Sequence, residues 1–213
     1  FRILPPGIYP DRKYSQQPEN SRLIVREKNG IGLDQYLLLQ VGSDFKRKGV
    51  PRTLQALASL PDVIRHRTRL MVVGQDKADR YRAQARQLGV EEQVQFFSGR
   101  DDVAELMSAA DLLLHPAVKE AAGIVLLEAV VAGLPVLTTE VCGYAGYINA
   151  AQCGVVIPGP FEQENLNTAL FDALQNNEQR SRWAGNARYF ADTEDLYSLA
   201  DKAADIILGP KND

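Results

Sequence analysis

Six short apolar runs recur along the chain and are separated by stretches with helical spacing. None of the runs contains a charged residue, and glycine, proline or a small polar residue follows or closes each one. Continuous apolar runs of this length are typical of strands that are buried on both faces, as in a parallel sheet. The six predicted strands cover Tyr36–Gly42, Leu70–Gly74, Val94–Gly99, Leu112–Pro116, Pro135–Thr138 and Gly154–Pro158.

The stretches between the runs carry apolar residues at steps of three or four, the spacing of one helix face. A short helix from Ser21 as N-cap to Asn29 is expected before the first strand, with Gly30 as its stop. Further helices are predicted around residues 50–61, 81–88, 103–110, 124–132, 166–174, 179–191 and 196–206. Six alternations of strand and helix predict an α/β fold, a Rossmann-like, doubly wound six-stranded parallel sheet.

Composition and charge narrow the class of protein. The 213 residues are 45% hydrophobic and 24% charged, with a net charge of −3. These values are those of a globular chain and show no basic excess, so we expect no nucleic-acid partner. Cys142 and Cys153 form no CxxC motif, which predicts two free, buried thiols in a reducing cytoplasm and no metal site.

One domain is expected, because no internal boundary interrupts the strand and helix rhythm. Residues 1–20 hold four prolines and are predicted to form an extended leading segment. The first residue is not Met, no signal peptide is evident, and no apolar run is long enough to span a bilayer. The sequence is therefore interpreted as part of a longer protein.

The residues that follow the strands are the candidates for chemistry, since ligands of open parallel sheets bind beyond the carboxyl ends. Gly42 and Ser43 close the first strand, where a small residue lets a ligand approach the backbone. The basic run Lys46 to Lys48 follows and is expected to open the next helix. Cations there oppose the helix dipole unless an anion such as phosphate binds.

The stretch from His115 to Glu128 is the most informative part of the sequence. Glu128 interrupts an apolar helix, and an unpartnered carboxylate is costly to bury. A helix that starts near Gly123 places Glu128 in its second turn and Glu120 in the preceding loop. The backbone amides of residues 122–124 then face an anion at the helix start. This spacing predicts two acceptors for sugar hydroxyls beside one phosphate site.

Glu120 and Glu128 are separated by seven residues, and the chain resembles the retaining GT-B glycosyltransferases of family 4, which carry an E-x7-E motif. Other matching segments, in the order of the family, are Pro5–Tyr9, Val41–Gly49, Phe97–Gly99, Ala110–Asp111 and Ala132–Val136. Across Gly123–Glu128 and Thr138–Tyr144 the resemblance is closest to bacterial lipopolysaccharide core glucosyltransferases that act on the first heptose. It identifies residues 1–213 as the C-terminal, donor-binding half, with the N-terminal acceptor domain absent.

The resemblance also implies a role for each site residue. Arg47 and Lys48 match the basic pair that contacts the donor diphosphate, and Glu128 matches the acceptor for the ribose hydroxyls. Glu120 matches the residue that holds the donor sugar. The remaining substrate-binding positions are Ala122, Gly123, Ile124, Gly42, Ser43, Arg100, near the base, and His115, which is expected to be a hydrogen-bonded residue that lines the cleft. His66, by contrast, is expected at the surface, and Trp183 and Tyr189 in the core or at a domain interface.

The same resemblance implies the partners. The expected substrates are a UDP-hexose, most simply UDP-glucose, and a heptose of the lipopolysaccharide inner core. No cofactor or metal is expected, because the family needs none and the sequence has no D-x-D motif. The full-length enzyme is expected in the cytoplasm, associated peripherally with the inner membrane, whereas the donor half alone is expected to be inactive.

Other readings remain open from the residues. A nicotinamide dehydrogenase needs G-x-G-x-x-G after the first strand, and residues 42–49 lack it. A receiver-like module is expected to carry acidic residues where this chain carries cations. A nucleotide-sugar epimerase of GT-B fold and a non-catalytic nucleotide-binding module stay as alternatives.

Overall fold

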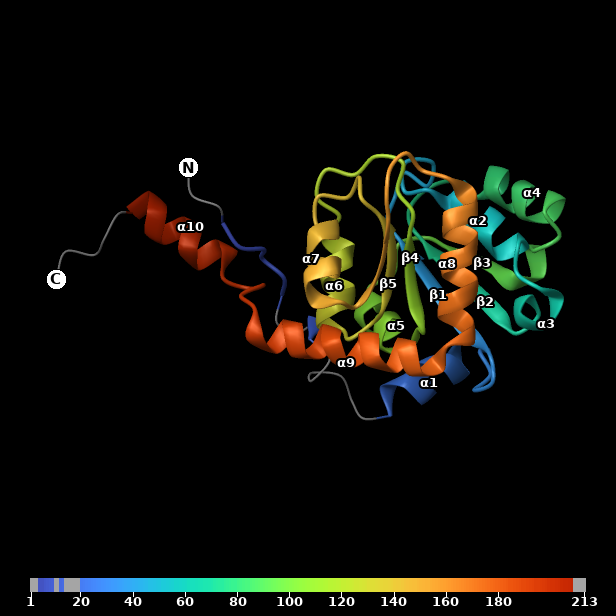
Figure 1. The fold of residues 1–213 in the computed structure, drawn as a ribbon, viewed down its shortest axis with the longest axis horizontal. Helices are drawn as coiled ribbons and strands as arrows, with labels where there is room; N and C mark the ends of the chain where they lie inside the picture. The colour runs from blue at the N-terminus through green and yellow to red at the C-terminus, as the bar shows by residue number, and fades with distance from the viewer. Residues whose placement is uncertain (1–3, 10–11, 14–19, 209–213) are drawn as a thin grey trace.

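The protein forms a six-stranded parallel sheet covered by helices on both faces (Figure 1), in a computed structural model that describes residues 4–9, 12–13 and 20–208. Every strand pairing is parallel, in the order β3-β2-β1-β4-β5-β6. The strands are β1 (Tyr36–Val41), β2 (Thr68–Val73), β3 (Val94–Phe97), β4 (Leu112–His115), β5 (Val136–Thr139) and β6 (Gly154–Ile157). The predicted fold class is confirmed.

One helix precedes the first strand, and further helices or helical turns follow the strands in chain order. They are α1 (Ser21–Lys28), α2 (Val50–Ala58), α3 (Asp62–Arg65), α4 (Asp79–Gln87), the 3-10 turn η3 (Glu91–Gln93), α5 (Val103–Ala109), α6 (Ile124–Val131), α7 (Ala145–Ala151), α8 (Gln163–Gln175), α9 (Asn177–Thr193) and α10 (Leu199–Leu208). One face of the sheet packs against α2, α4 and α8, and the other against α1, α5, α6 and α7. Because both faces are covered, the strands show no apolar–polar alternation.

Several boundaries differ from the sequence prediction by one to three residues, and the helix α7 (Ala145–Ala151) was not predicted. β2 begins at Thr68 rather than Leu70, because Thr68 and Arg69 continue the register against β1, and the charge of Arg69 hides this in the sequence. α1 has Asn20, not Ser21, at its N-cap position. The Ser21 hydroxyl instead lies 3.3 Å from the hydroxyl of Ser108 on α5.

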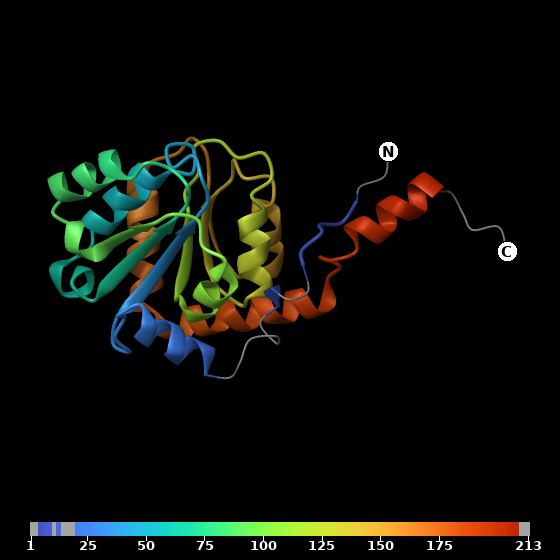
Figure 2. The ribbon, with the colours of Figure 1, turned by 180° about the vertical axis from the view of Figure 1, so that it is seen from behind.

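The two ends of the described chain lie side by side, away from the sheet. In both views, residues 4–9 and α10 extend from the body together (Figures 1 and 2). The amide of Ile8 donates to the carbonyl of Leu196, 2.9 Å away, and both side chains are buried. Pro10 and Pro18 of the expected leading segment lie outside the described residues.

The strand order reverses between β1 and β4, and this positions the site. The chain builds β1, β2 and β3 outward in one direction, then returns to place β4 on the other side of β1. In doubly wound folds the ligand crevice lies at such a switch point, beyond the carboxyl ends of the two strands where the order reverses. In Figure 1 the loops after β1 and β4 lie at the top of the sheet, above these two strands.

Gly49 lets these two loops approach each other closely. It has a φ of 79° and forms the N-cap of α2, and a Cβ atom there would overlap the carbonyl oxygen of Pro116 in the loop after β4. Gly89 has a similar φ of 70°, but nothing lies within 4 Å of its Cβ position. Alanine substitutions at Gly49 and Gly89 therefore separate the cost of backbone strain, which both share, from the cost of the overlap with Pro116, which only Gly49 has.

We predict that Gly49→Ala destabilises the fold by about 3 kcal/mol or more. Left-handed backbone alone costs a residue with a Cβ about 1–2 kcal/mol, and overlap with a fixed carbonyl adds about 1–3 kcal/mol. Gly89→Ala, the matched control, is expected to lose only the first contribution. Urea unfolding of both variants measures the difference, and equal losses would contradict the close approach.

Candidate functional site

An ion pair joins the loops after β1 and β4. Lys48 lies in the turn before α2, and Glu120 lies in the loop between β4 and α6; the Lys48 ammonium donates to Oε2 of Glu120. The two side chains are only 14% and 9% exposed. The Val118 amide also donates to the carbonyl of Arg47 at 2.8 Å, so backbone and side chains hold the loops together.

The ion pair determines the ionisation of Glu120. Burial alone raises the pKa of this carboxyl, but the hydrogen bond and charge of Lys48 outweigh burial, and its pKa lies below the usual value. Glu120 is therefore an anion near neutral pH. A carboxylate can accept about four hydrogen bonds, so Glu120 keeps capacity for further donors beside Lys48.

His115, the last residue of β4, lies behind the ion pair. Its side chain is fully buried, and its Nε2 lies 3.6 Å from the same Oε2 of Glu120, beyond hydrogen-bond distance. Neither ring nitrogen has a hydrogen-bond partner among the described residues. The predicted hydrogen bond of His115 is therefore not made within the described part of the chain, and the ring is fully buried. Burial and the charge of Lys48 lower the pKa of His115 to about 4.

Glu128 lies in the second turn of α6, as expected from the motif spacing. Its side chain is half-buried, and within the described residues no hydrogen bond or ion pair is recorded for the carboxylate. Burial raises the pKa of this carboxyl, and Arg12 opposes the shift only in part. The structure does not supply the backbone partner that a purely structural buried glutamate needs.

The start of α6 presents backbone donors. Gly123 is the N-cap with a φ of 80°, and no side chain caps the helix. In the part of the chain that the structure describes, the amides of Ala122, Gly123 and Ile124 donate to no backbone carbonyl. Three free amides at a helix start form an environment that favours an anion.

The basic run lies differently from the expectation. Residues 46–48 form a turn before α2 rather than its first turn, since Gly49 occupies the N-cap. Only Lys48 turns inward. Lys46 is exposed, and the Arg47 Nε lies 3.2 Å from Asp44, with 45% of the Arg47 side chain exposed. The Arg47 side chain is thus accessible at the rim of the crevice.

The other predicted residues are placed by neighbouring strands. Gly42 has a φ of 130°, and the Ser43 hydroxyl accepts from the Gln75 amide at 3.1 Å, which joins the ends of β1 and β2. Arg100, after β3, pairs with Asp102 and lies 5.0 Å from the Phe97 ring centroid. No hydrogen bond or ion pair in the described part joins Arg100 to the Lys48–Glu120 pair.

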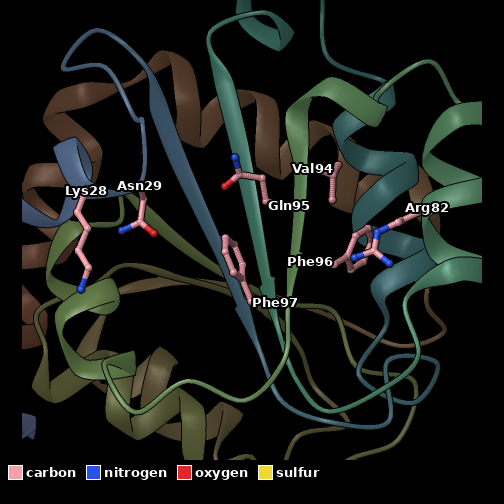
Figure 3. Close-up of a pocket in the computed structure, with 7 residues that line it drawn as sticks. All are labelled: Lys28, Asn29, Arg82, Val94, Gln95, Phe96 and Phe97. Atoms are coloured by element: carbon pink, nitrogen blue, oxygen red, sulfur yellow. The ribbon is translucent and has the colours of Figure 1, made fainter.

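A hollow of about 490 Å³ lies elsewhere, along the sheet edge formed by β3 (Figure 3). Arg82 reaches it from α4 and lies 5.7 Å from the Phe96 ring centroid, while Lys28 and Asn29 approach from the end of α1. None of the predicted site residues lines this hollow. It contains one strand rather than a convergence of strand ends, so we do not assign the site there.

The sequence analysis did not identify three residues whose side chains hold the loops after β1 and β4 in place by hydrogen bonds: Gln40, Thr139 and Arg52. Gln40, buried in β1, donates to the carbonyl of Lys48 at 2.8 Å. Thr139 donates to the carbonyl of Ala117 at 2.8 Å, and Arg52 donates to the same carbonyl at 2.8 Å. A glutamine inside an apolar run was the available signal, because a buried amide requires a partner.

The remaining expectations have mixed outcomes. Cys142 and Cys153 are free and buried, and His66 is exposed, as predicted. Trp183 is partly buried against the core, whereas Tyr189 is 72% exposed and does not belong to the core. Within residues 4–9, 12–13 and 20–208, no group of three or more potential metal ligands was found, and no helix is long and apolar enough to cross a membrane.

The chain is a doubly wound α/β domain whose switch point carries a cation and free helix amides, groups that suit an anionic ligand. The comparisons with known proteins give the family: residues 21–190 match glycosyl transferases group 1, and the chain belongs to this family. The chain is 67% identical over 209 residues to the lipopolysaccharide glucosyltransferase WaaG of Escherichia coli K12. The match covers 98% of this chain and 56% of that relative, so the chain spans little more than half its length.

Solved structures agree with the fold. A crystal structure of WaaG, described as a glycosyltransferase involved in lipopolysaccharide biosynthesis, superposes with a TM-score of 0.95 over 98% of this chain and 56% of that chain. Anabaena HepE, solved with UDP and glucose, gives a TM-score of 0.84 at 21% identity, covering 97% of this chain and 56% of that one. At that identity the match concerns the fold alone.

The lowered pKa of the buried His115 imidazole leads us to predict that the free energy of unfolding depends on pH. Because the pKa of His115 is lowered from 6.5 to about 4, the unfolded chain binds more protons below pH 6.5. His115 should therefore lower stability as pH falls from 6.5 to 4, by on the order of 3 kcal/mol. Urea unfolding at several pH values should show that His115→Leu flattens this part of the stability curve. Parallel curves for both proteins would contradict the shift.

Proposed function

We propose that the chain is the donor-binding half of a retaining hexosyltransferase that transfers glucose from UDP-glucose to an inner-core heptose of lipopolysaccharide. The observation that carries the proposal is the placement of the Lys48–Glu120 pair beside the start of α6, whose first amides donate to no backbone carbonyl among the described residues and whose second turn carries Glu128. An anion fits the amides and the cation, and hydroxyl groups fit the carboxylates. The 67% identity to a lipopolysaccharide glucosyltransferase supports glucose as the sugar.

Each residue takes a part in binding the donor. Arg47 and Lys48 contact the diphosphate together with the amides at the start of α6. Glu128 accepts from the ribose hydroxyls, which gives its carboxylate hydrogen-bond partners that the described residues do not supply. Glu120 accepts from the hydroxyls of the glucose. Arg100 lies after β3, where the family pattern places the base.

In the transfer step, the bond between the anomeric carbon and the phosphate oxygen breaks, and a bond to the acceptor hydroxyl oxygen forms on the same face. The departing UDP takes the proton of that hydroxyl. Arg47, Lys48 and the amides of α6 stabilise the negative charge that develops on the phosphate, as a metal ion does in other transferases. No metal is needed in this scheme.

The acceptor and the location follow from the same proposal. The heptose acceptor binds to the other half of the enzyme, so the donor half alone performs no transfer. The full-length enzyme works in the cytoplasm at the inner membrane, with a peripheral association, because its acceptor is a membrane lipid. The described relatives are all glycosyltransferases, which favours this function over an epimerase or a non-catalytic nucleotide-binding module.

The two glutamates provide the test, by calorimetry in EDTA with UDP and with UDP-glucose. Glu128→Gln should weaken both ligands about tenfold or more, since each hydrogen bond to a charged group contributes about 1.5–3 kcal/mol. Glu120→Gln should weaken UDP-glucose by a similar factor and leave UDP unchanged or slightly tighter, because it also releases Lys48 from its ion pair.

Stability provides the control for the same variants. Glu128→Gln should hold or raise stability at pH 7, because a raised carboxyl pKa means that the folded state disfavours the ionised form. Glu120→Gln should lower it, because Lys48 loses its partner. Equal losses of UDP affinity from both substitutions would contradict the assigned roles, and binding only with Mg²⁺ would contradict the metal-free scheme.

A further inference from the structure

His115 is a buried polar side chain that the free protein leaves without a partner. It ends β4, directly after three leucines, and it is fully buried. An unpartnered buried polar group costs about 1–3 kcal/mol, which a fourth apolar residue would avoid. No strand pairing requires an imidazole, because the strand pairs through its backbone. A hydrogen-bond partner for the imidazole would therefore lower the free energy of the protein, and the ligand-free structure provides none among its described residues.

The nearest candidate partner is the Glu120 carboxylate, which in the free protein is held by Lys48. His115 Nε2 lies 3.6 Å from Glu120 Oε2, the oxygen to which Lys48 donates. A shift of roughly 0.6 Å would bring the imidazole within hydrogen-bond distance of that oxygen. Lys48 is also the residue assigned to the donor diphosphate, so the bound phosphate competes with Glu120 for the Lys48 ammonium.

We propose that His115 is a positioning residue that takes over the Glu120 carboxylate when the donor diphosphate draws Lys48 away. The Nε2–H of a neutral imidazole donates to Oε2, and the other lone pairs of the carboxylate remain free for the sugar hydroxyls. The inference rests on the proposed function, since the diphosphate supplies the pull on Lys48. No covalent step is involved.

The surroundings of His115 suit a neutral imidazole that donates a hydrogen bond, and they do not suit a general base. In the free protein, burial and the charge of Lys48 lower the pKa of His115 to about 4, so the ring is neutral at pH 7; burial, the larger cause, still acts when Lys48 turns to the diphosphate. The ring has no exposed surface, so it cannot reach an acceptor hydroxyl in this arrangement. Its effect on the donor sugar acts through Glu120.

The test compares His115→Leu with His115→Gln, whose side-chain amide keeps an N–H near the position of Nε2. His115→Leu should bind UDP-glucose about tenfold more weakly at pH 7 and bind UDP within about threefold of wild type. His115→Gln should restore most of the UDP-glucose affinity. His66→Gln, a substitution at the exposed histidine, is the matched control and should change neither affinity.

Stability separates positioning from simple packing. His115→Leu removes an unpartnered polar group, so its stability at pH 7 should equal or exceed that of wild type, whereas a packing histidine would lose stability when replaced. In the wild-type chain, ¹⁵N spectra of the labelled ring should show a neutral imidazole protonated at Nε2 when UDP-glucose is bound. This second readout does not depend on the folding of a variant.

The outcomes distinguish this inference from the proposed function. Suppose that the wild type binds UDP-glucose. If His115→Leu then binds it equally well, or if His115→Gln fails to restore binding, the positioning role of His115 is overturned while the proposed function stands. A bound-state ring protonated at Nδ1 overturns the positioning role as well. If wild type does not bind UDP-glucose, both the proposed function and the role of His115 fall.

Discussion

The Lys48 ammonium and the Glu120 carboxylate meet between the loops that follow two adjacent strands, and both charges are largely removed from solvent. Neither charge is tolerable alone at this depth, because breaking a buried ion pair costs about 3–5 kcal/mol. The pair, the bond from Val118 to Arg47 and the close approach at Gly49 hold the two loops together without any ligand. A donor therefore meets an assembled crevice and has to exchange side-chain partners rather than move the backbone.

Some of the hydrogen-bonding groups without partners lie beside this ion pair, on the strands that lead into it. Among the described residues, the buried unpartnered side-chain atoms belong to Arg26, Gln40 and His115, and the latter two lie on the strands that carry the site. Glu128 and the amides at the start of α6 add to them. Elsewhere a buried cation is satisfied: Arg180 donates to the carbonyls of Ala173 and Leu174. Such a distribution is expected where stability is given up for ligand binding.

The fold was predictable because strands that are buried on both faces have continuous apolar sequences, as β1, β4 and β5 do; the edge strands β3 and β6 are only partly buried but keep an apolar run. The spacing of Glu120 and Glu128 likewise placed one in a loop and the other in the second turn of α6. The direction in which a side chain turns was not predictable. Lys46, Arg47 and Lys48 look equivalent in the sequence, yet only Lys48 turns inward, and the enclosure of His115 depends on loops that are distant in the chain. Gln40 shows that a single polar residue in an apolar run marks such contacts.

The separation of Lys48 Nζ from Glu120 Oε2 in a crystal structure of the chain with UDP-glucose tests the central claim most directly. The ion pair of the free protein should open, with Lys48 within hydrogen-bond distance of the diphosphate and Glu120 in contact with the sugar hydroxyls. A structure in which UDP-glucose is bound at the crevice while Lys48 still donates only to Glu120 would contradict the account. The ion pair would then be a permanent tie between the loops and not a contact that the donor replaces.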